Sequence, residues 1–192
     1  TKQNKPNGAA HGTKISLGNY QNKHKMLQYR QPQIKNTDME LDTIDLRILR
    51  ILQNDSKISN VELAKKINLS ASPTLARVKN LETQGVISRY VGLVDPAALG
   101  LKMTVFIQVS LDRQESATLN RFEEEVVQFN QVMEVYLMTG DEDYLLRIVV
   151  PDIQSLERFI LDHLTKIPGI KKIRSSFALK QVKYKTALPV DI

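Results

Sequence analysis

The chain has 192 residues, of which 42% are hydrophobic and 25% charged, a composition typical of one globular domain or two small ones. It contains no cysteine, which excludes disulfides and thiolate ligands, and it lacks any run of about 18 apolar residues, so we expect a cytoplasmic protein without a membrane span. The net charge of +6 lies mainly in residues 1–40, which hold seven Lys or Arg against Asp38 and Glu40, so overall charge alone does not indicate nucleic-acid binding.

Residues 1–38 show neither helical nor strand periodicity and are rich in Asn, Gln, Lys and Gly. This composition predicts a disordered or non-native extension. A basic tail that contacts DNA phosphates is the functional alternative. Organised sequence is expected to begin near Met39.

Three short amphipathic helices are predicted in residues 39–90. The first has Asp42 as its N-cap, the second starts at about Asn60, and the third follows Ser70. Asn68 suits a left-handed cap at the end of the second helix, and Gly85 ends the third. The apolar side chains expected to face inward from the second and third helices are Val61, Leu63, Ala64, Ile67, Leu75, Val78 and Leu81.

The segment "VISRYVGLVDPAALGL" is rich in β-branched and aromatic residues and is then broken by Asp95-Pro96. It predicts a hairpin or wing followed by a linker strand over residues 91–101. Residues 102–186 then read strand, helix, strand, strand, helix, strand, with strict alternation in "KMTVFIQVSL". That order predicts a βαββαβ, ferredoxin-like domain followed by a tail over residues 187–192. The expected fold class is therefore α+β.

The third predicted helix carries small or polar side chains opposite its apolar stripe. Such a face can enter a DNA major groove about 12 Å wide and offer hydrogen bonds to bases or phosphates. A plain three-helix bundle would need the same apolar stripe, so spacing alone leaves both interpretations open. The residues that we predict to contact DNA are Ser70, Ser72, Pro73, Thr74, Ala76, Arg77, Lys79 and Asn80.

The segments "LDTIDLRIL", "LSASPTLARVKNLETQGVI" and "TGDEDYLL" occur in this order at spacings that resemble the leucine-responsive regulatory protein (Lrp/AsnC) family. The resemblance covers residues 39–186. It implies a transcription regulator that binds double-stranded DNA through a helix-turn-helix, winged or simple, and senses an amino acid or similar effector through its C-terminal domain. It also implies a homodimer that can assemble into tetramers or octamers.

The resemblance places effector binding at the loop Met138, Thr139, Gly140, Asp141, Asp143 and Tyr144. A glycine turn exposes backbone N–H groups that can bind a carboxylate, and Asp141 or Asp143 could bind an α-ammonium group. The alternative is that Gly140-Asp141 is an ordinary hairpin turn and Tyr144 a core residue.

Two other functions remain open from the residues. Some proteins that resemble this family are siroheme decarboxylases, but His163 is the lone histidine of the predicted folded part. No nucleophile triad, metal-ligand cluster or phosphate-binding loop is evident, so we predict a protein that is not an enzyme and needs no cofactor or metal. The other alternative is an effector-binding module that does not bind DNA.

Overall fold

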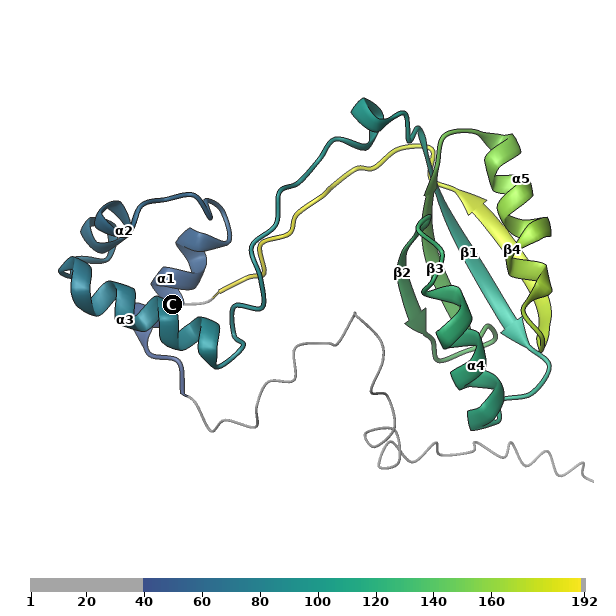
Figure 1. Ribbon diagram of the computed structural model, residues 1–192, viewed down its shortest axis with the longest axis horizontal. Helices are drawn as coiled ribbons and strands as arrows, with labels where there is room; N and C mark the ends of the chain where they lie inside the picture. Colours follow the sequence, from purple (N-terminus) through teal and green to yellow (C-terminus); the bar gives the residue numbers. More distant parts are fainter. Residues whose placement is uncertain (1–39, 191–192) are drawn as a thin grey trace, which may run out of the picture. The chain divides into compact units, whose positions relative to one another are not determined.

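The computed structural model describes residues 40–190, so the predictions for residues 1–38 lie outside the described residues. Within that range, the helices and strands follow the predicted order except between residues 91 and 101, and they are labelled in Figure 1. The helical part contains α1 (Thr43–Leu52), α2 (Asn60–Ile67) and α3 (Ala71–Thr83). The sheet part contains β1 (Met103–Leu111), α4 (Ser116–Val126), β2 (Val132–Leu137), β3 (Tyr144–Val150), α5 (Ile153–Asp162) and β4 (Ile170–Phe177).

The predicted helix boundaries arise from local capping. Asp42 and Asp45 form a reciprocal capping box at the start of α1, and Ser59 and Glu62 form another at the start of α2. Asn68 ends α2 in the left-handed conformation (φ 59°, ψ 45°), as predicted. Ser70 is the N-cap of α3, also as predicted, but its side chain makes no capping hydrogen bond.

The core of the helical domain consists of Ile48, Leu63, Ile67 and Leu81, all of them buried. Two predicted core positions are wrong, because the side chains of Val61 and Leu75 are 55% and 44% exposed. On α3 the inward stripe is Thr74, Val78 and Leu81 instead, at i, i+4 and i+7. Leu75 lies one position further around the helix and faces outward.

The predicted linker strand over residues 91–101 is absent from the described chain, which has no strand between α3 and β1. The segment is extended and then forms the 3-10 helix η2 (Pro96–Leu99), which begins where the Asp95 side chain accepts a hydrogen bond from the N–H of Ala97. Its β-branched side chains, including Val91 and Val94, are exposed. β-propensity alone does not make a strand, because a strand also needs a partner for its N–H and C=O groups.

The C-terminal domain has the predicted ferredoxin-like arrangement. Its four antiparallel strands lie in the order β2-β3-β1-β4, with α4 and α5 against one face of the sheet (Figure 1). The alternation predicted for β1 is confirmed, since Val105, Ile107, Val109 and Leu111 are all buried under the helices. Leu119, Phe122 and Val126 of α4 and Leu156 and Phe159 of α5 complete this core.

The last strand ends well before residue 186, where the predicted domain ends. β4 ends at Phe177, and no helix or strand is assigned over residues 178–190. The hydrophobic side chains of Leu179, Val182 and Tyr184 in this segment are largely exposed. Among the described residues, no helix is long and apolar enough to cross a membrane.

Candidate functional site

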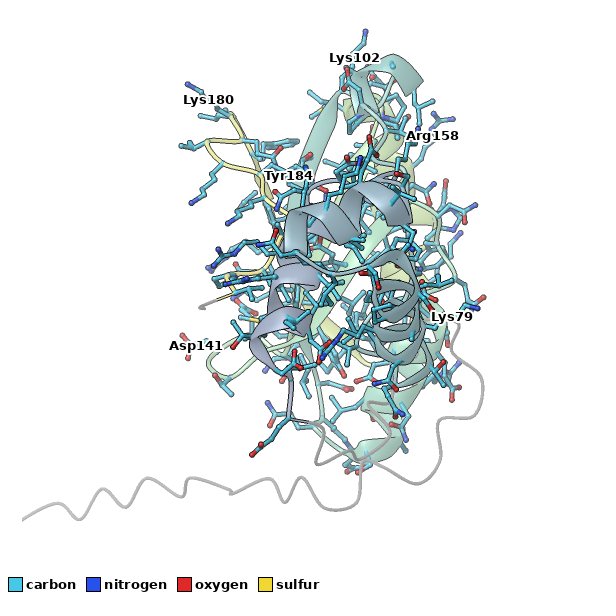
Figure 2. All side chains as sticks on the ribbon, turned by 90° about the vertical axis from the view of Figure 1, so that its left-hand side faces the viewer. Lys79, Lys102, Asp141, Arg158, Lys180 and Tyr184 are labelled. Carbon is cyan, nitrogen blue, oxygen red and sulfur yellow. The ribbon has the colours of Figure 1, made fainter. Side chains whose placement is uncertain are left out.

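The outward face of α3 carries most of the side chains that we predict to contact DNA. Figure 2 shows Lys79 extending away from the body of the domain. Because none of these side chains belongs to the core, the face is free to contact a partner. The exposed members of the predicted set are Ser70, Ser72, Pro73, Ala76, Lys79 and Asn80.

Thr74 is an exception among the predicted contacts. Its side chain is fully buried, and its Oγ1 donates a hydrogen bond of 2.9 Å to the carbonyl oxygen of Ser70. This back-bond satisfies the hydroxyl inside the helix and leaves no route from the side chain to DNA. Thr74 is therefore a packing residue, and its prediction as a contact is corrected.

Arg77 connects α3 to the first turn of α1. Its Nη1 lies 2.7 Å from a carboxylate oxygen of Asp42 and 2.9 Å from one of Asp45, and its side chain is 32% exposed. The backbone N–H of Asp45, and then the Arg77 guanidinium, hold the pKa of Asp42 below its usual range. Arg77 thus supports the position of α3, while part of its side chain remains accessible.

A side-chain hydrogen bond that the sequence did not predict connects α2 to α3. The Asn60 amide at the start of α2 donates a hydrogen bond of 2.8 Å from Nδ2 to the carbonyl oxygen of Ala71 at the start of α3. This contact joins the two helices of the motif at their N-terminal ends. The angle between them is therefore set by polar contact as well as by apolar packing.

The loop between β2 and β3 contains the predicted effector residues. Met138, Thr139, Gly140 and Asp141 are exposed, and Figure 2 shows Asp141 on a loop at the edge of the domain. Gly140 has φ +131°, a backbone conformation that L side chains rarely adopt. The N–H of Met138 donates to the carbonyl oxygen of Asp143 at 2.8 Å, which closes the loop at its base.

The other two predicted effector residues are buried. Asp143 accepts a 2.7 Å hydrogen bond from the N–H of Leu111 and a 2.5 Å hydrogen bond from the amide of Gln114. Tyr144 is buried against Phe122, with ring centroids 4.5 Å apart, and it donates its hydroxyl hydrogen to Glu123. Both residues hold the loop on its sheet, so their side chains are poorly placed to bind an effector.

Two family models match this chain, one on each domain. The model described as "Winged helix-turn-helix DNA-binding" matches residues 41–88, which include α1 to α3. The model described as "Lrp/AsnC ligand binding domain" matches residues 104–188, which include the four-stranded sheet except Met103. The boundary between the two matches falls in the segment that contains η2.

Relatives match this chain over most of their own length. The chain is 46% identical over 151 residues to the Bkd operon transcriptional regulator of Pseudomonas aeruginosa, a match that covers 79% of this chain and 99% of the relative. The chain belongs to the Lrp/AsnC family. It is also 38% identical to the leucine-responsive regulatory protein of Rhizobium meliloti over 76% of this chain and 93% of that relative.

A solved structure of a transcriptional regulator supports the assignment. The transcriptional regulator NMB0573 of Neisseria meningitidis, in complex with L-Met, superimposes with a TM-score of 0.76 at 36% identity. The match covers 79% of this chain and 98% of that one. The predicted family and fold class are therefore confirmed, and this Lrp/AsnC member is a transcriptional regulator with a DNA-binding domain and a ligand-binding domain.

The alternatives raised by the sequence are resolved by these relatives. They are transcriptional regulators, which confirms the prediction that this Lrp/AsnC protein is not an enzyme. The match to a DNA-binding helix-turn-helix argues against a module that binds an effector alone. No cluster of His, Cys, Asp and Glu that could hold a metal ion occurs in the part of the chain that the structure describes.

Proposed function

We propose that this Lrp/AsnC regulator reads double-stranded DNA with the exposed face of α3. The observation that carries the proposal is the separation of α3 into two faces, an inward stripe at Thr74, Val78 and Leu81 and an outward face of small and polar side chains. Such a face fits a major groove, where amide side chains can bond base edges and lysines can contact phosphates. The proposed contacts are Ser70, Ser72, Pro73, Ala76, Lys79 and Asn80.

Arg77 has two roles in this proposal. Its contacts with Asp42 and Asp45 hold α3 in position, and its accessible part can approach a phosphate.

We infer a cytoplasmic location from the DNA-binding role, because a transcriptional regulator must occur in the compartment that contains its DNA.

We further propose a homodimer formed through the sheet face that α4 and α5 leave uncovered. Phe106 of β1 and Tyr136 of β2 place partly exposed aromatic rings on that face. Between them, Arg147 of β3 pairs with Glu134 of β2 at 2.5 Å, with both side chains only partly exposed. An uncovered sheet face of this mixed character suits a second copy of the chain, and such dimers can assemble further into tetramers or octamers.

In a dimer, two copies of α3 would bind two half-sites. The expected target is a pseudo-palindrome whose half-sites lie one helical turn of DNA, or a multiple of it, apart. An amino acid or similar effector would bind the exposed loop tip, Met138 to Asp141, and change assembly or DNA affinity. Coupling between two such sites is commonly about 1–3 kcal/mol.

Lys79 provides the direct test of the proposed DNA-binding face. We expect Lys79→Ala to lower DNA affinity and to reduce the slope of log affinity against log salt by about 1, because it removes one phosphate contact. Lys102→Ala is the matched control, because Lys102 is an exposed lysine of the other domain. Gel-shift titrations at several salt concentrations measure both quantities. Equal salt slopes for the two variants would exclude a phosphate contact at Lys79.

A further inference from the structure

The carboxylate of Glu142, in the loop between β2 and β3, contacts two strands at once. One oxygen accepts a hydrogen bond from the hydroxyl of Ser110 on β1, and the other lies 3.0 Å from Nζ of Lys172 on β4. The Glu142 side chain is only 12% exposed. Neither carboxylate oxygen is therefore left without a partner.

The sheet register explains how one side chain reaches both strands. Ser110 and Lys172 lie directly opposite each other in the antiparallel β1–β4 pair. Both lie on the face away from the helices, because the neighbouring residues Val109 and Leu111 are buried under them. Since β1 separates β3 from β4, Glu142 connects the β2–β3 loop to the far side of the sheet.

The electrostatic surroundings favour the charged form of this side chain. The Ser110 hydroxyl and then the Lys172 ammonium hold the pKa of Glu142 below its usual range, with a smaller contribution from Arg174. Arg174 lies two residues beyond Lys172 on the same strand face. The contact is thus an ion pair that persists at neutral pH.

The loop is consequently divided into a held part and a free part. Glu142 is bound by Ser110 and Lys172, and the backbone N–H of Asp143 donates to the carbonyl oxygen of Val109 at 3.0 Å. Thr139, Gly140 and Asp141 are exposed. Holding one end of a short loop limits the conformations that its tip can adopt, and a tip that is already ordered binds a ligand at a lower entropic cost.

We propose that Glu142 is a positioning residue of the effector site. By binding β1 and β4, it fixes the conformation of the loop tip without touching the effector itself. This inference rests on the proposed function, in which the tip of this loop binds an amino acid. It adds to that proposal the side chain that sets how tightly the effector is held.

The test compares variants of the full chain in titrations with L-leucine and with L-methionine. Glu142→Gln and Lys172→Met each remove the ion pair, and we expect either to raise the Kd for the amino acid about tenfold. Glu124→Gln is the matched control, because Glu124 is an exposed carboxylate of α4 with no ion pair among the described residues. DNA affinity without amino acid is expected to stay unchanged in Glu124→Gln. Because Ser110 and Lys172 lie on the sheet face proposed for the dimer, light scattering measures the oligomeric state of Glu142→Gln and Lys172→Met. Dissociation of these variants would attribute the raised Kd to lost assembly and overturn the inference.

A charge-swapped double variant, E142K with K172E, separates positioning from general stability. It restores an ion pair with reversed polarity, so we expect the Kd for the amino acid to return toward the wild-type value. Recovery of binding without a matching recovery of the melting temperature would show that the ion pair acts on the loop and not on overall stability. Hydrogen exchange of the loop amides should be faster in Glu142→Gln than in Glu124→Gln.

Two failures can be told apart. If the wild-type chain binds neither amino acid, the proposed effector and the inference about Glu142 are both wrong. If the wild-type chain binds one of them and Glu142→Gln binds it equally well, the inference about Glu142 is wrong and the proposed function stands. The same conclusion follows if the charge-swapped variant stays as weak as the single variants.

Discussion

Arg77 lies on the proposed DNA-binding helix, yet its guanidinium contacts the two carboxylates that cap α1. Asp45 is buried, so the loss of Arg77 would leave a carboxylate with little access to water and one partner fewer. At the scale of single residues, the proposed recognition of DNA by α3 therefore depends on side chains that hold this helix in place as well as on those proposed to contact DNA.

Arg77→Ala is expected to weaken DNA binding and to lower the free energy of unfolding of the helical domain by about 1–3 kcal/mol, because it leaves Asp45 short of a partner. Asp45→Asn should reproduce part of both effects although Asp45 does not face DNA. Chemical denaturation and gel-shift titration measure the two quantities. If Asp45→Asn leaves DNA affinity unchanged while Arg77→Ala lowers it, Arg77 acts by direct contact alone.

The backbone conformation of Gly140 is expected to be required for the response to an amino acid. With φ at +131°, Gly140→Val is strained even though nothing lies within 4 Å of the added Cβ. We expect the amino-acid response to be lost while DNA binding without amino acid persists. Gly100→Val is the control, because Gly100 also has a positive φ (+75°) and open space around it. An unaltered response in Gly140→Val would remove the loop from the effector site.

At the scale of the helices, the N-cap residues of α1, α2 and α3 differ in the hydrogen bonds that their side chains make. Asp42 and Ser59 belong to capping boxes, whereas Ser70 makes no side-chain capping bond. The start of α3 is held instead by the Thr74 hydroxyl and by Asn60. At this scale, α3, the helix proposed to contact DNA, has an N-cap side chain that makes no capping hydrogen bond and could instead bond a partner.

Replacing the N-cap serines separates stability from recognition. Ser59→Ala is expected to cost about 1 kcal/mol of unfolding free energy, because it removes a capping box. Ser70→Ala should cost much less and should instead weaken DNA binding. Urea denaturation and gel-shift titration on the same two variants test this contrast. Equal destabilisation by both would mean that the Ser70 hydroxyl caps α3 in solution.

At the scale of the whole molecule, the described chain has two hydrophobic cores that share no residue. One is built around Ile48, Leu63, Ile67 and Leu81, and the other lies between the sheet and the helices α4 and α5. Each core is complete within its own domain. A substitution in one core therefore need not repack the other.

Separate cores predict separate effects of core substitutions. Leu81→Ala is expected to destabilise the helical domain by about 2–5 kcal/mol through the cavity it leaves, while amino-acid binding by the other domain persists. Leu75→Ala on the same helix is the control, because Leu75 is exposed. Circular dichroism melting and amino-acid titration provide the measurements. Loss of amino-acid binding in Leu81→Ala would show that the two domains fold as one unit.

The sequence by itself determined the order of the elements, their caps and the family. These features depend on local rules, such as a carboxylate three residues before a free N–H or alternation along a strand, and so Asp42, Asn68 and the β1 pattern were predicted correctly. The motif order across both domains was specific enough to identify the Lrp/AsnC family.

Only the tertiary structure decided which side chains are free to act. The phase of α3 depends on its packing against α1 and α2, which turned Thr74 inward and Leu75 outward. Arg77, Asp143 and Glu142 found partners about 30 residues away along the chain. Such contacts exist only after distant elements pack together, and no local spacing encodes them. The sequence therefore located the α3 helix and the Gly140 loop, and packing determined which of their side chains are exposed and so available for the proposed contacts with DNA or an effector.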